Sequence, residues 1–355
     1  MRILITGNMG YVGPVLVRHL RSTIPNAELI GYDAGFFGHS LTRNAGLPET
    51  MLDRQVYGDT RELPMGLLDG VDAVVHLAAL SNDPIGTKFA KPTRDVNYKA
   101  STRLAAMARD AGVKSFVFAS SCSVYGEAGE AARRETDGTN PLTAYAQSKI
   151  DTEAALRQMD LGDMTVSCLR FATACGMSDR LRLDLVVNDF VACAIVDKKI
   201  TVLSDGTPWR PLIDVADMAR AIEWATGRKR EQGGPALVVN VGSDQWNYRV
   251  SELAQAVVKK VPGVSMSVNT NAPPDKRSYR VDFSLFRSLA PNHQPQMTLE
   301  NSITRIHDGL TSIGFADSAF RSGPFVRLKE FERLMAAGLV TDDVRWNHPA
   351  RALAS

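Results

Sequence analysis

The stretch that decides the fold is RILITGNMGYVG, residues 2–13. Its first five residues form an apolar run with the length of a buried strand, and an amphipathic pattern typical of a helix begins at Gly13. Gly7, Gly10 and Gly13 stand between the two, at steps of three residues. Glycines in this setting allow a tight turn, a close approach of a pyrophosphate to the backbone, and close packing of helix on strand. We therefore expect a phosphate-binding turn in front of a helix N-terminus.

An acidic residue ends the next apolar run, AELIGYD at residues 27–33. Asp33 follows Gly13 by 20 residues. A carboxylate at this position accepts hydrogen bonds from the hydroxyls of an adenosine ribose and repels a 2′-phosphate, which favours NAD over NADP. The alternative is an ordinary turn followed by a solvated Asp, since the spacing G-x-x-G-x-x-G is weakly diagnostic by itself.

Apolar and amphipathic segments alternate through the rest of the first half. We expect strands at residues 2–6, 28–32, 73–77, 115–119 and 165–170, and helices at residues 13–21, 95–111 and 144–158. Polar residues rarely interrupt the expected strands, which is typical of parallel strands covered by helices on both faces. The sequence thus predicts an α/β fold with a Rossmann-type doubly wound parallel sheet.

The second half has a less regular pattern, which predicts a smaller, mostly helical lobe that binds substrate. Its expected elements are helices at residues 185–197 and 324–337, a helix with Ser251 as its N-cap, and a loop at residues 269–280. The expected NAD-binding domain is residues 1–177 with a return around 208–245, and the expected substrate lobe is residues 178–207 and 246–355. The lobe should sit on the carboxyl ends of the strands, where open α/β sheets bind their ligands.

Composition excludes several classes of function. The 355 residues include 41 Lys and Arg and 39 Asp and Glu, a net charge of +2, so neither nucleic acid nor a membrane surface is an expected partner. No apolar run reaches the ~18 residues of a transmembrane helix, and the N-terminus lacks the core of a signal peptide. The four cysteines and six histidines have neither disulfide-scaffold nor metal-ligand spacing. We expect a cytoplasmic protein without a metal.

Two short motifs carry residues suited to proton transfer. YAQSK places Tyr145 and Lys149 four residues apart, on one face of an expected helix. A lysine ammonium and a nicotinamide ribose cation nearby would lower the pKa of the tyrosine, which could then exchange a proton with a sugar hydroxyl or ketone. SSCSVYG, residues 120–126, places serines at the carboxyl end of an expected strand. For the Tyr–Lys pair alone, chance spacing on a helix surface is the alternative.

The motifs occur in an order that resembles the extended short-chain dehydrogenase/reductase family, and within it the NAD-dependent nucleotide-sugar epimerases and dehydratases of the UDP-glucose 4-epimerase kind. The motifs that carry the resemblance are TGNMGYVG, Asp33, Gly58-Asp59, HLAA at residues 76–79, Asn97, SSCSVYG and YAQSK. Later segments also fit, namely LRFATACG, VVNDFV, DGTPWRPLIDVADMARAI and DKRSYRVDF. The resemblance covers nearly the whole chain.

The resemblance implies a role for each matching residue. Tyr145 would be the catalytic acid and base, Lys149 would hold the nicotinamide ribose, and Ser121 would polarise the sugar oxygen. Asp59 would reach the adenine amino group, and Asn97 would serve main-chain structure more than chemistry. The implied NAD-binding residues are Gly7, Asn8, Met9, Gly10, Tyr11, Val12, Gly13, Asp33, Asp59, Thr60, Leu77, Ala78, Ala79, Asn97, Tyr145 and Lys149.

The resemblance also implies a nucleotide-sugar site, formed by Ser81, Asp83, Ser123, Thr173, Asn188, Arg210 and Arg277. Asn188, Arg210 and Arg277 would contact the phosphates, because guanidinium forks suit phosphate oxygens. A surface pair of Arg277 with a nearby acid such as Asp275 is the alternative. Asp83 is either a second acid–base group or the cap of the next helix, and the sequence leaves both open.

Two positions depart from relatives with other chemistry. Where the 4,6-dehydratases carry an Asp-Glu pair, this chain has Cys122 and Ser123, and a neutral thiol and a hydroxyl are poor replacements for an acid and a base. The 3,5-epimerases carry a cysteine at the position of Ser123. Cys122 stands one place too early, so we expect it to be a packed core thiol.

The expected reaction is therefore 4-epimerisation of a nucleotide sugar through a transient 4-keto sugar, with NAD bound throughout. The alternatives within the family are a nucleotide-sugar ketoreductase or dehydrogenase and a decarboxylase of a nucleotide uronic acid; a non-catalytic NAD-binding regulator is more remote. The resemblance also implies a homodimer formed through residues 95–111 and 144–158. The sequence names neither the nucleotide base nor the sugar.

Overall fold

A parallel sheet forms the centre of the computed structural model, which describes residues 1–42, 46–269, 271–272 and 277–347. The strand order is β10-β6-β5-β4-β1-β2-β3. The bounds are β1 Arg2–Thr6, β2 Glu28–Asp33, β3 Arg54–Tyr57, β4 Ala73–His76, β5 Ser115–Ser121, β6 Thr165–Phe171 and β10 Ala236–Val241. The order reverses between β1 and β4, and in doubly wound sheets a ligand crevice opens at that point. The predicted α/β fold is confirmed.

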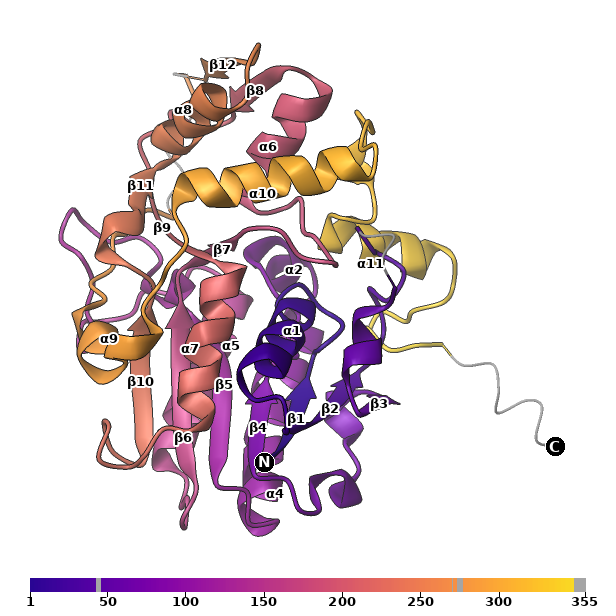
Figure 1. The fold of residues 1–355 in the computed structure, drawn as a ribbon, viewed down its shortest axis with the longest axis vertical. Helices are drawn as coiled ribbons and strands as arrows, with labels where there is room; N and C mark the ends of the chain where they lie inside the picture. Colours follow the sequence, from indigo (N-terminus) through magenta and orange to yellow (C-terminus); the bar gives the residue numbers. More distant parts are fainter. Residues whose placement is uncertain (43–45, 270, 273–276, 348–355) are drawn as a thin grey trace.

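Helices cover both faces of this sheet. α1 (Gly13–Thr23) and α7 (Val215–Thr226) pack on one face, in front of the sheet in Figure 1, and α4 (Ser101–Asp110) and α5 (Ala144–Gln158) pack on the other. Successive β1 side chains enter different cores, because side chains alternate along a strand: Ile3 and Ile5 face α1, and Leu4 faces α4. The central strands β1, β4, β5 and β6 are buried on both faces, which explains their continuous apolar sequence.

The helix predicted at residues 95–111 is longer and less regular than expected. It begins as α3 (Ala90–Arg94), continues through a π-helical turn at Asp95–Ala100, and ends as α4. Asn97 lies within the π-helical turn and is fully buried. π-helical turns often occur next to functional sites, and this one lies beside the loop that follows β4.

A second group of elements lies above the carboxyl ends of the strands (Figure 1). It contains α6 (Val186–Val196), α8 (Val250–Lys260) and α10 (Leu299–Ser312), which pack on one another. Two small sheets join them, β11-β9-β7 and β12-β8. Their bounds are β7 Thr173–Cys175, β8 Lys199–Val202, β9 Trp209–Asp214, β11 Asn247–Arg249 and β12 Ser265–Val268. The expected mostly helical lobe therefore also contains two sheets.

The predicted N-cap of α8 is wrong. The helix begins at Val250, and its cap residue is Arg249, the last residue of β11, whose N–H donates to the Glu252 carboxylate at 2.7 Å. The strand runs directly into the helix, so Ser251 already lies inside its first turn. The predicted loop at residues 269–280 and the alternative partner Asp275 lie partly or wholly outside the described residues.

The C-terminal part of the chain returns to the first strands. α9 (Ser284–Leu289) packs near β10, and α11 (Arg327–Ala336) packs on the segment that follows β2 and on α2. Figure 1 shows α11 on the side of the molecule where β2 and β3 lie. Phe331 and Leu334 of α11 share an apolar cluster with Leu80 and Phe89. In the part of the chain that the structure describes, no helix combines the length and the apolarity that a membrane span requires.

Candidate functional site

A cavity of about 860 Å³ lies over the carboxyl ends of β1, β2, β4 and β5. Most of the predicted site residues line it: Gly7, Gly10, Tyr11, Val12, Asp33, Asp59, Thr60, Leu77, Ala78, Ala79, Ser81, Asp83, Ser121, Ser123, Tyr145, Lys149, Thr173, Arg210 and Arg277. Asn8, Met9, Gly13, Asn97 and Asn188 are not among its lining residues. The cavity is at the upper end of the size range of small-molecule sites.

The glycine turn has no room for side chains. Gly7 has a φ of +75°, and a Cβ there would lie 2.5 Å from the backbone N of Ala78. A Cβ on Gly13 would overlap the backbone of Asn8, so this glycine serves helix packing from behind the cavity wall. α1 starts without a side-chain cap. Apart from Pro14, which has no N–H, the first residues of α1 therefore keep N–H groups available to an anion, as a bound pyrophosphate requires.

Asp33 closes the turn from the end of β2. Its carboxylate accepts hydrogen bonds from the N–H groups of Met9 at 3.0 Å and Gly35 at 2.7 Å. Burial raises the pKa of Asp33, and the two backbone hydrogen bonds oppose the rise. Each carboxylate oxygen has a second lone pair, so the group can also accept from a ribose diol. The turn, the uncapped helix and Asp33 together fit NAD.

Asp59, the predicted adenine contact, is already ion-paired. The Arg61 guanidinium donates to both of its oxygens, at 3.0 Å from Nε and 2.6 Å from Nη2, and Arg345 lies 3.9 Å away. Burial favours a higher pKa for Asp59, but the hydrogen bonds and charge of Arg61 outweigh it and hold the pKa below its ordinary value. Asp59 therefore stays a carboxylate at neutral pH.

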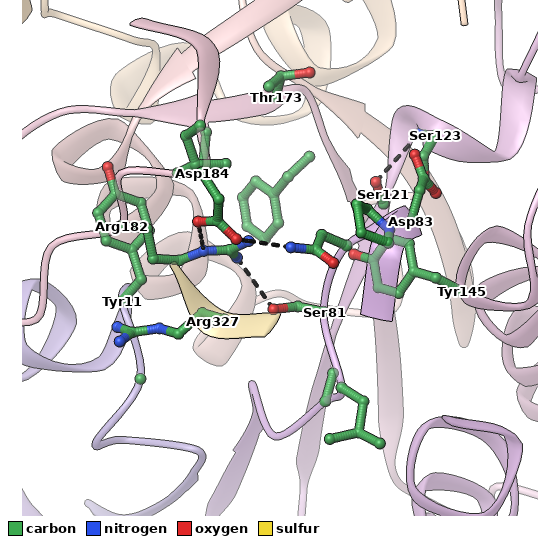
Figure 2. Close-up of a pocket in the computed structure, with 18 of the residues that line it drawn as sticks. Tyr11, Ser81, Asp83, Ser121, Ser123, Tyr145, Thr173, Arg182, Asp184 and Arg327 are labelled. Atoms are coloured by element: carbon green, nitrogen blue, oxygen red, sulfur yellow. Dashed lines mark hydrogen bonds and ion pairs between the residues drawn. The ribbon is translucent and has the colours of Figure 1, made fainter. Parts of the chain in front are cut away.

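Tyr145, Ser121 and Lys149 meet where β5 ends against α5 (Figure 2 shows the first two). The Ser121 hydroxyl lies beside Tyr145 and lowers its pKa. The Lys149 ammonium donates to the backbone O of Ala119 at 2.6 Å and lies 5.5 Å from the centre of the Tyr145 ring. Ser121 from β5 and Tyr145 from α5 thus face a common point in the cavity, where a sugar oxygen can lie.

The predicted low pKa of Tyr145 is not a property of the chain alone. Burial raises the pKa of Tyr145 to about 12, and the Ser121 hydroxyl and the Arg182 charge offset this only in part. Burial also lowers the pKa of Lys149 to about 8. The prediction counted on the nicotinamide ribose cation as well as on the lysine, and the lysine by itself does not produce the shift.

A buried ion pair fixes the helix that carries these residues. Glu153 lies one turn after Lys149, and its carboxylate pairs with Arg170 of β6 at 2.6 Å and accepts from the Ser120 hydroxyl.

The imidazole of His76 is held between the hydroxyls of Thr6 and Ser101, and burial lowers its pKa to about 3. His76 is therefore neutral and structural.

Ser123 and its neighbour Cys122 point in different directions. The Ser123 hydroxyl is buried without a hydrogen-bond partner among the described residues, and the residue lines the cavity. Such a group marks a place for a ligand atom, since buried hydroxyls are rarely left unpaired. Cys122 is fully buried; its thiol donates to the backbone O of Arg170, and burial raises the thiol pKa. The predicted core thiol is confirmed, although Cys122 starts a 3₁₀ turn after β5.

Asp83 does not cap the helix that follows. The cap of α2 (Asp83–Lys88) is Asn82, whose side chain accepts from the N–H of Ile85 at 2.9 Å. The Asp83 carboxylate instead accepts from the Thr143 hydroxyl at 2.6 Å and pairs with Arg277 at 3.3 Å. Thr143 is in turn the N-cap of α5, so Asp83 connects the start of α5 to Arg277.

Two predicted contacts lie behind the cavity wall. Asn97 accepts from the N–H of Leu80 at 2.8 Å and donates to the same residue's carbonyl at 3.0 Å, so it fixes the loop after β4. Asn188 is fully buried; it accepts from the N–H of Gly176 and donates to the Tyr11 hydroxyl and the Arg182 carbonyl. Its side chain is thus occupied by the protein, and the structure does not bring it to the phosphates.

Sequence reasoning missed a charged group in the middle of the cavity (Figure 2). Arg182 is buried; it pairs with both oxygens of Asp184 at 2.9 Å and donates to the Ser81 hydroxyl at 3.1 Å. Asn82 donates to the same Asp184 carboxylate at 2.7 Å. The signal was the run RLRLD at residues 180–184.

Among the described residues, no three His, Cys, Asp or Glu side chains gather as a metal site would require.

Known proteins resemble this chain along most of its length. It is 28% identical over 282 residues to a UDP-glucose 4-epimerase of Lactobacillus helveticus, covering 75% of this chain and 83% of the relative. It is 26% identical over 317 residues to UDP-glucuronic acid decarboxylase 6 of Arabidopsis thaliana, covering 85% and 87%. The solved structure of MoeE5 in complex with UDP-glucose and NAD matches with a TM-score of 0.72 and 25% identity, over 88% of this chain and 99% of that one.

A family model matches residues 3–242, a span that contains the glycine turn, Asp33, Ser121, Tyr145 and Lys149. The relatives with the same fold include epimerases and decarboxylases, so the match establishes kinship and the cofactor class but not one reaction. The chain belongs to the NAD dependent epimerase/dehydratase family.

Proposed function

We propose that the protein is an NAD-dependent nucleotide-sugar 4-epimerase. The observation that carries the proposal is the pair of Tyr145 and Ser121 with Lys149 at one end of the cavity. A glycine turn that fits the pyrophosphate of NAD lies at the other end of the same cavity, and the Tyr145–Ser121 pair faces the space between. The pair can move one proton to or from a sugar oxygen. The two positions after Ser121 hold a buried core thiol, Cys122, and a hydroxyl that lines the cavity, Ser123, rather than an acid and a base.

NAD, when bound, would supply the chemistry of accepting a hydride from a sugar carbon and returning it. Gly7, Gly10 and the start of α1 would hold its pyrophosphate, and Asp33 the adenosine ribose. The Lys149 ammonium, fixed by the carbonyl of Ala119, would hold the nicotinamide ribose. The main-chain part of this cradle fits any dinucleotide; Asp33 favours the one without a 2′-phosphate.

The protein's own part of the reaction is proton transfer and orientation. Tyr145 takes the proton of the C4 hydroxyl as that carbon is oxidised, and returns it when the keto-sugar is reduced from its other face. Ser121 donates to the sugar oxygen and keeps it within reach of Tyr145. Because the pKa of Tyr145 is about 12 in the chain alone, a nearby positive charge must stabilise the phenolate, and the cation of oxidised NAD is suited to that.

A nucleotide uronic acid decarboxylase is the second candidate, because Arg182 brings a cation into the cavity and relatives include such decarboxylases. Its charge favours a carboxylate on the sugar. However, the same guanidinium already pairs with both oxygens of Asp184. The pair is close to neutral, so a neutral sugar fits this part of the cavity better than a second carboxylate does.

The remaining substrate contacts, the domain bounds and the oligomeric state are proposed from the same family resemblance. Arg210 and Arg277 line the cavity and would hold the phosphates of the nucleotide sugar, with Ser81, Ser123 and Thr173 toward the sugar. Residues 1–177 with 208–245 would bind NAD, and residues 178–207 with 246–355 would bind substrate. A homodimer through α4 and α5 is expected; sedimentation that gives a monomer at working concentrations would contradict it.

The test is to denature the purified protein, identify the nucleotide it releases, and offer fresh protein a panel of UDP-, GDP-, dTDP- and CDP-sugars. We expect released NAD and interconversion of C4 epimers with no net NADH. Net oxidation or reduction of the cofactor would instead indicate a dehydrogenase or reductase, and release of CO₂ a decarboxylase. Binding without turnover of any sugar would favour a regulator.

A further inference from the structure

A buried arginine from the far end of the chain lines the cavity without a carboxylate partner. Arg327, the first residue of α11, is 2% exposed, and its Nη1 has no hydrogen-bond partner among the described residues. Its Nη2 donates to the backbone O of Arg180 at 2.9 Å, and its guanidinium lies 4.2 Å from the centre of the Phe37 ring. A buried cation left in this state is costly unless a ligand completes it.

The neighbouring buried arginine, Arg180, differs from Arg327 because it has a carboxylate partner. The Arg180 guanidinium pairs with the Glu49 carboxylate at 2.6 and 3.0 Å. In the described part of the chain, no such acid lies within ion-pair distance of Arg327. Burial, together with the charges of Arg182 and Arg180, lowers the pKa of Arg327 to about 9. Arg327 is therefore still a cation at neutral pH; the residue lines the cavity, and its Nη1 is a buried donor without a hydrogen-bond partner among the described residues.

The position of Arg327 identifies the anion that it suits. Figure 2 places its guanidinium on the side of Tyr11, across the cavity from Ser121 and Tyr145. A chain of hydrogen bonds connects it to the glycine turn: Arg327 to the carbonyl of Arg180, the N–H of Arg180 to the Ser178 hydroxyl, and that hydroxyl to the carbonyl of Tyr11. This is the end of the cavity where the uncapped start of α1 lies.

The segment that carries Arg327, residues 327–347, is fastened to the same end of the cavity. Trp346 stacks on Phe36 at 5.0 Å and donates to the backbone O of Ala34 at 2.5 Å. Arg61 donates to the carbonyls of Asp343 at 2.8 Å and Val344 at 2.7 Å. Phe331 and Val344 line the cavity themselves. The anchors of the segment are thus the residues that follow Asp33 and Asp59.

The backbone of Val344 gives independent evidence that contacts with the rest of the molecule hold residues 327–347 in this position. Its φ is +52°, in the left-handed region that a β-branched residue rarely adopts, and its side chain is 1% exposed. Such backbone strain persists only where the surrounding contacts determine it, and it gathers at ligand sites. Here those contacts are the two hydrogen bonds from Arg61, the partner of Asp59.

We propose that residues 327–347 form the last wall of the dinucleotide site and that Arg327 donates to the diphosphate of the bound dinucleotide. This rests on the proposed NAD binding. The guanidinium would add a side-chain contact to a phosphate site that is otherwise main chain. A nucleotide sugar also carries a diphosphate, but its predicted ligands Arg210 and Arg277 come from other segments of the cavity wall.

The test uses the full chain, freed of bound nucleotide, and titrates it with NAD by calorimetry. Arg327→Met should weaken NAD binding by about 10- to 100-fold, the usual loss of a charge-assisted hydrogen bond. Arg327→Lys should recover part of the affinity. Lys329→Met is the matched control, because Lys329 lies on the same helix, is not among the residues that line the cavity, and pairs with half-buried Glu332; its NAD affinity should equal that of the wild type.

Two further measurements separate the explanations. The melting temperature of nucleotide-free Arg327→Met should be unchanged or higher, since an unpaired buried charge is removed; a lower temperature with a proportionate loss of affinity would mean a structural role and overturn the proposal. UDP affinity of the NAD-loaded variant should be unchanged, and a loss for UDP but not for NAD would also overturn it. If the wild type binds no NAD, the proposed function fails; equal NAD affinity of wild type and variant refutes this proposal alone.

Discussion

The two ends of the cavity are built in different ways. At the end beside α1, the glycine turn and the uncapped helix present main chain, and Asp33 serves partly to hold the turn. At the end beside α2 and α5, side chains from distant segments meet: Asp83 pairs with Arg277, and the Arg182–Asp184 pair toward the middle of the cavity contacts Ser81 and Asn82. Main chain can recognise only what all dinucleotides share, so the choice of sugar and reaction must lie with the side-chain end.

The largest expected effect is at the side-chain end. Tyr145→Phe removes the hydroxyl that exchanges the proton, and general acid–base catalysis is worth about 10²- to 10⁴-fold. We therefore expect kcat to fall by about 10³-fold. NAD and UDP affinities, measured by calorimetry, should stay within about 3-fold of the wild type, the usual context-dependence of a single contact. Full turnover by this variant on its best sugar would remove Tyr145 from the mechanism.

A matched pair of glycines tests the main-chain end. Gly7 and Gly112 have nearly equal φ, +75° and +79°, but a Cβ at Gly112 meets nothing within 4 Å, whereas at Gly7 it meets the backbone of Ala78. Each substitution by Ala carries the strain of positive φ, of order 1 kcal/mol in unfolding free energy. Gly7→Ala should in addition weaken NAD binding by at least about 10-fold, because the turn must move away from the phosphates. Equal NAD affinities for the two variants would contradict the main-chain account.

A smaller effect is expected from the charge between the two ends. Arg182 lowers the pKa of Tyr145, whose largest influence is burial. Arg182→Met removes that lowering, so the Tyr145 pKa rises and the base form becomes rarer at a given pH. The ascending limb of kcat against pH should therefore move to higher pH, by about half a unit to one unit. A shift to lower pH, or no shift with a lower kcat, would mean that Arg182 acts by contact with the sugar.

The main-chain end of the cavity could be predicted from the sequence more fully than the side-chain end. Five strands were predicted within two residues of their observed ends, because strands buried on both faces are continuous apolar runs. The glycine turn, Ser121, Tyr145 and Lys149 belong to short local motifs, so their meeting point followed from the expected fold. The π-helical turn at Asp95–Ala100 was not predictable, since it depends on packing rather than on local pattern.

The side-chain end could be predicted only in part, for a physical reason. Asp83 and Arg277 are 194 residues apart in sequence and meet only in the folded chain. Local pattern left Asp83 open between a second acid–base group and a helix cap; Asn82 takes the place of the cap, and Asp83 forms the ion pair. Arg327 had no local motif at all; only its burial without a carboxylate partner distinguishes it from the surface arginines.

The most direct test of the central claim is to run the reaction in D₂O on the sugar that the panel identifies and to locate deuterium in the product by NMR. A 4-epimerase that oxidises C4 and returns the same hydride gives a product inverted at C4 with hydrogen, not deuterium, on that carbon, and no net NADH. Deuterium at C5, or a product that has lost water or CO₂, would contradict the account, because those reactions need acids, bases or an open cation that Cys122, Ser123 and the Arg182–Asp184 pair do not supply.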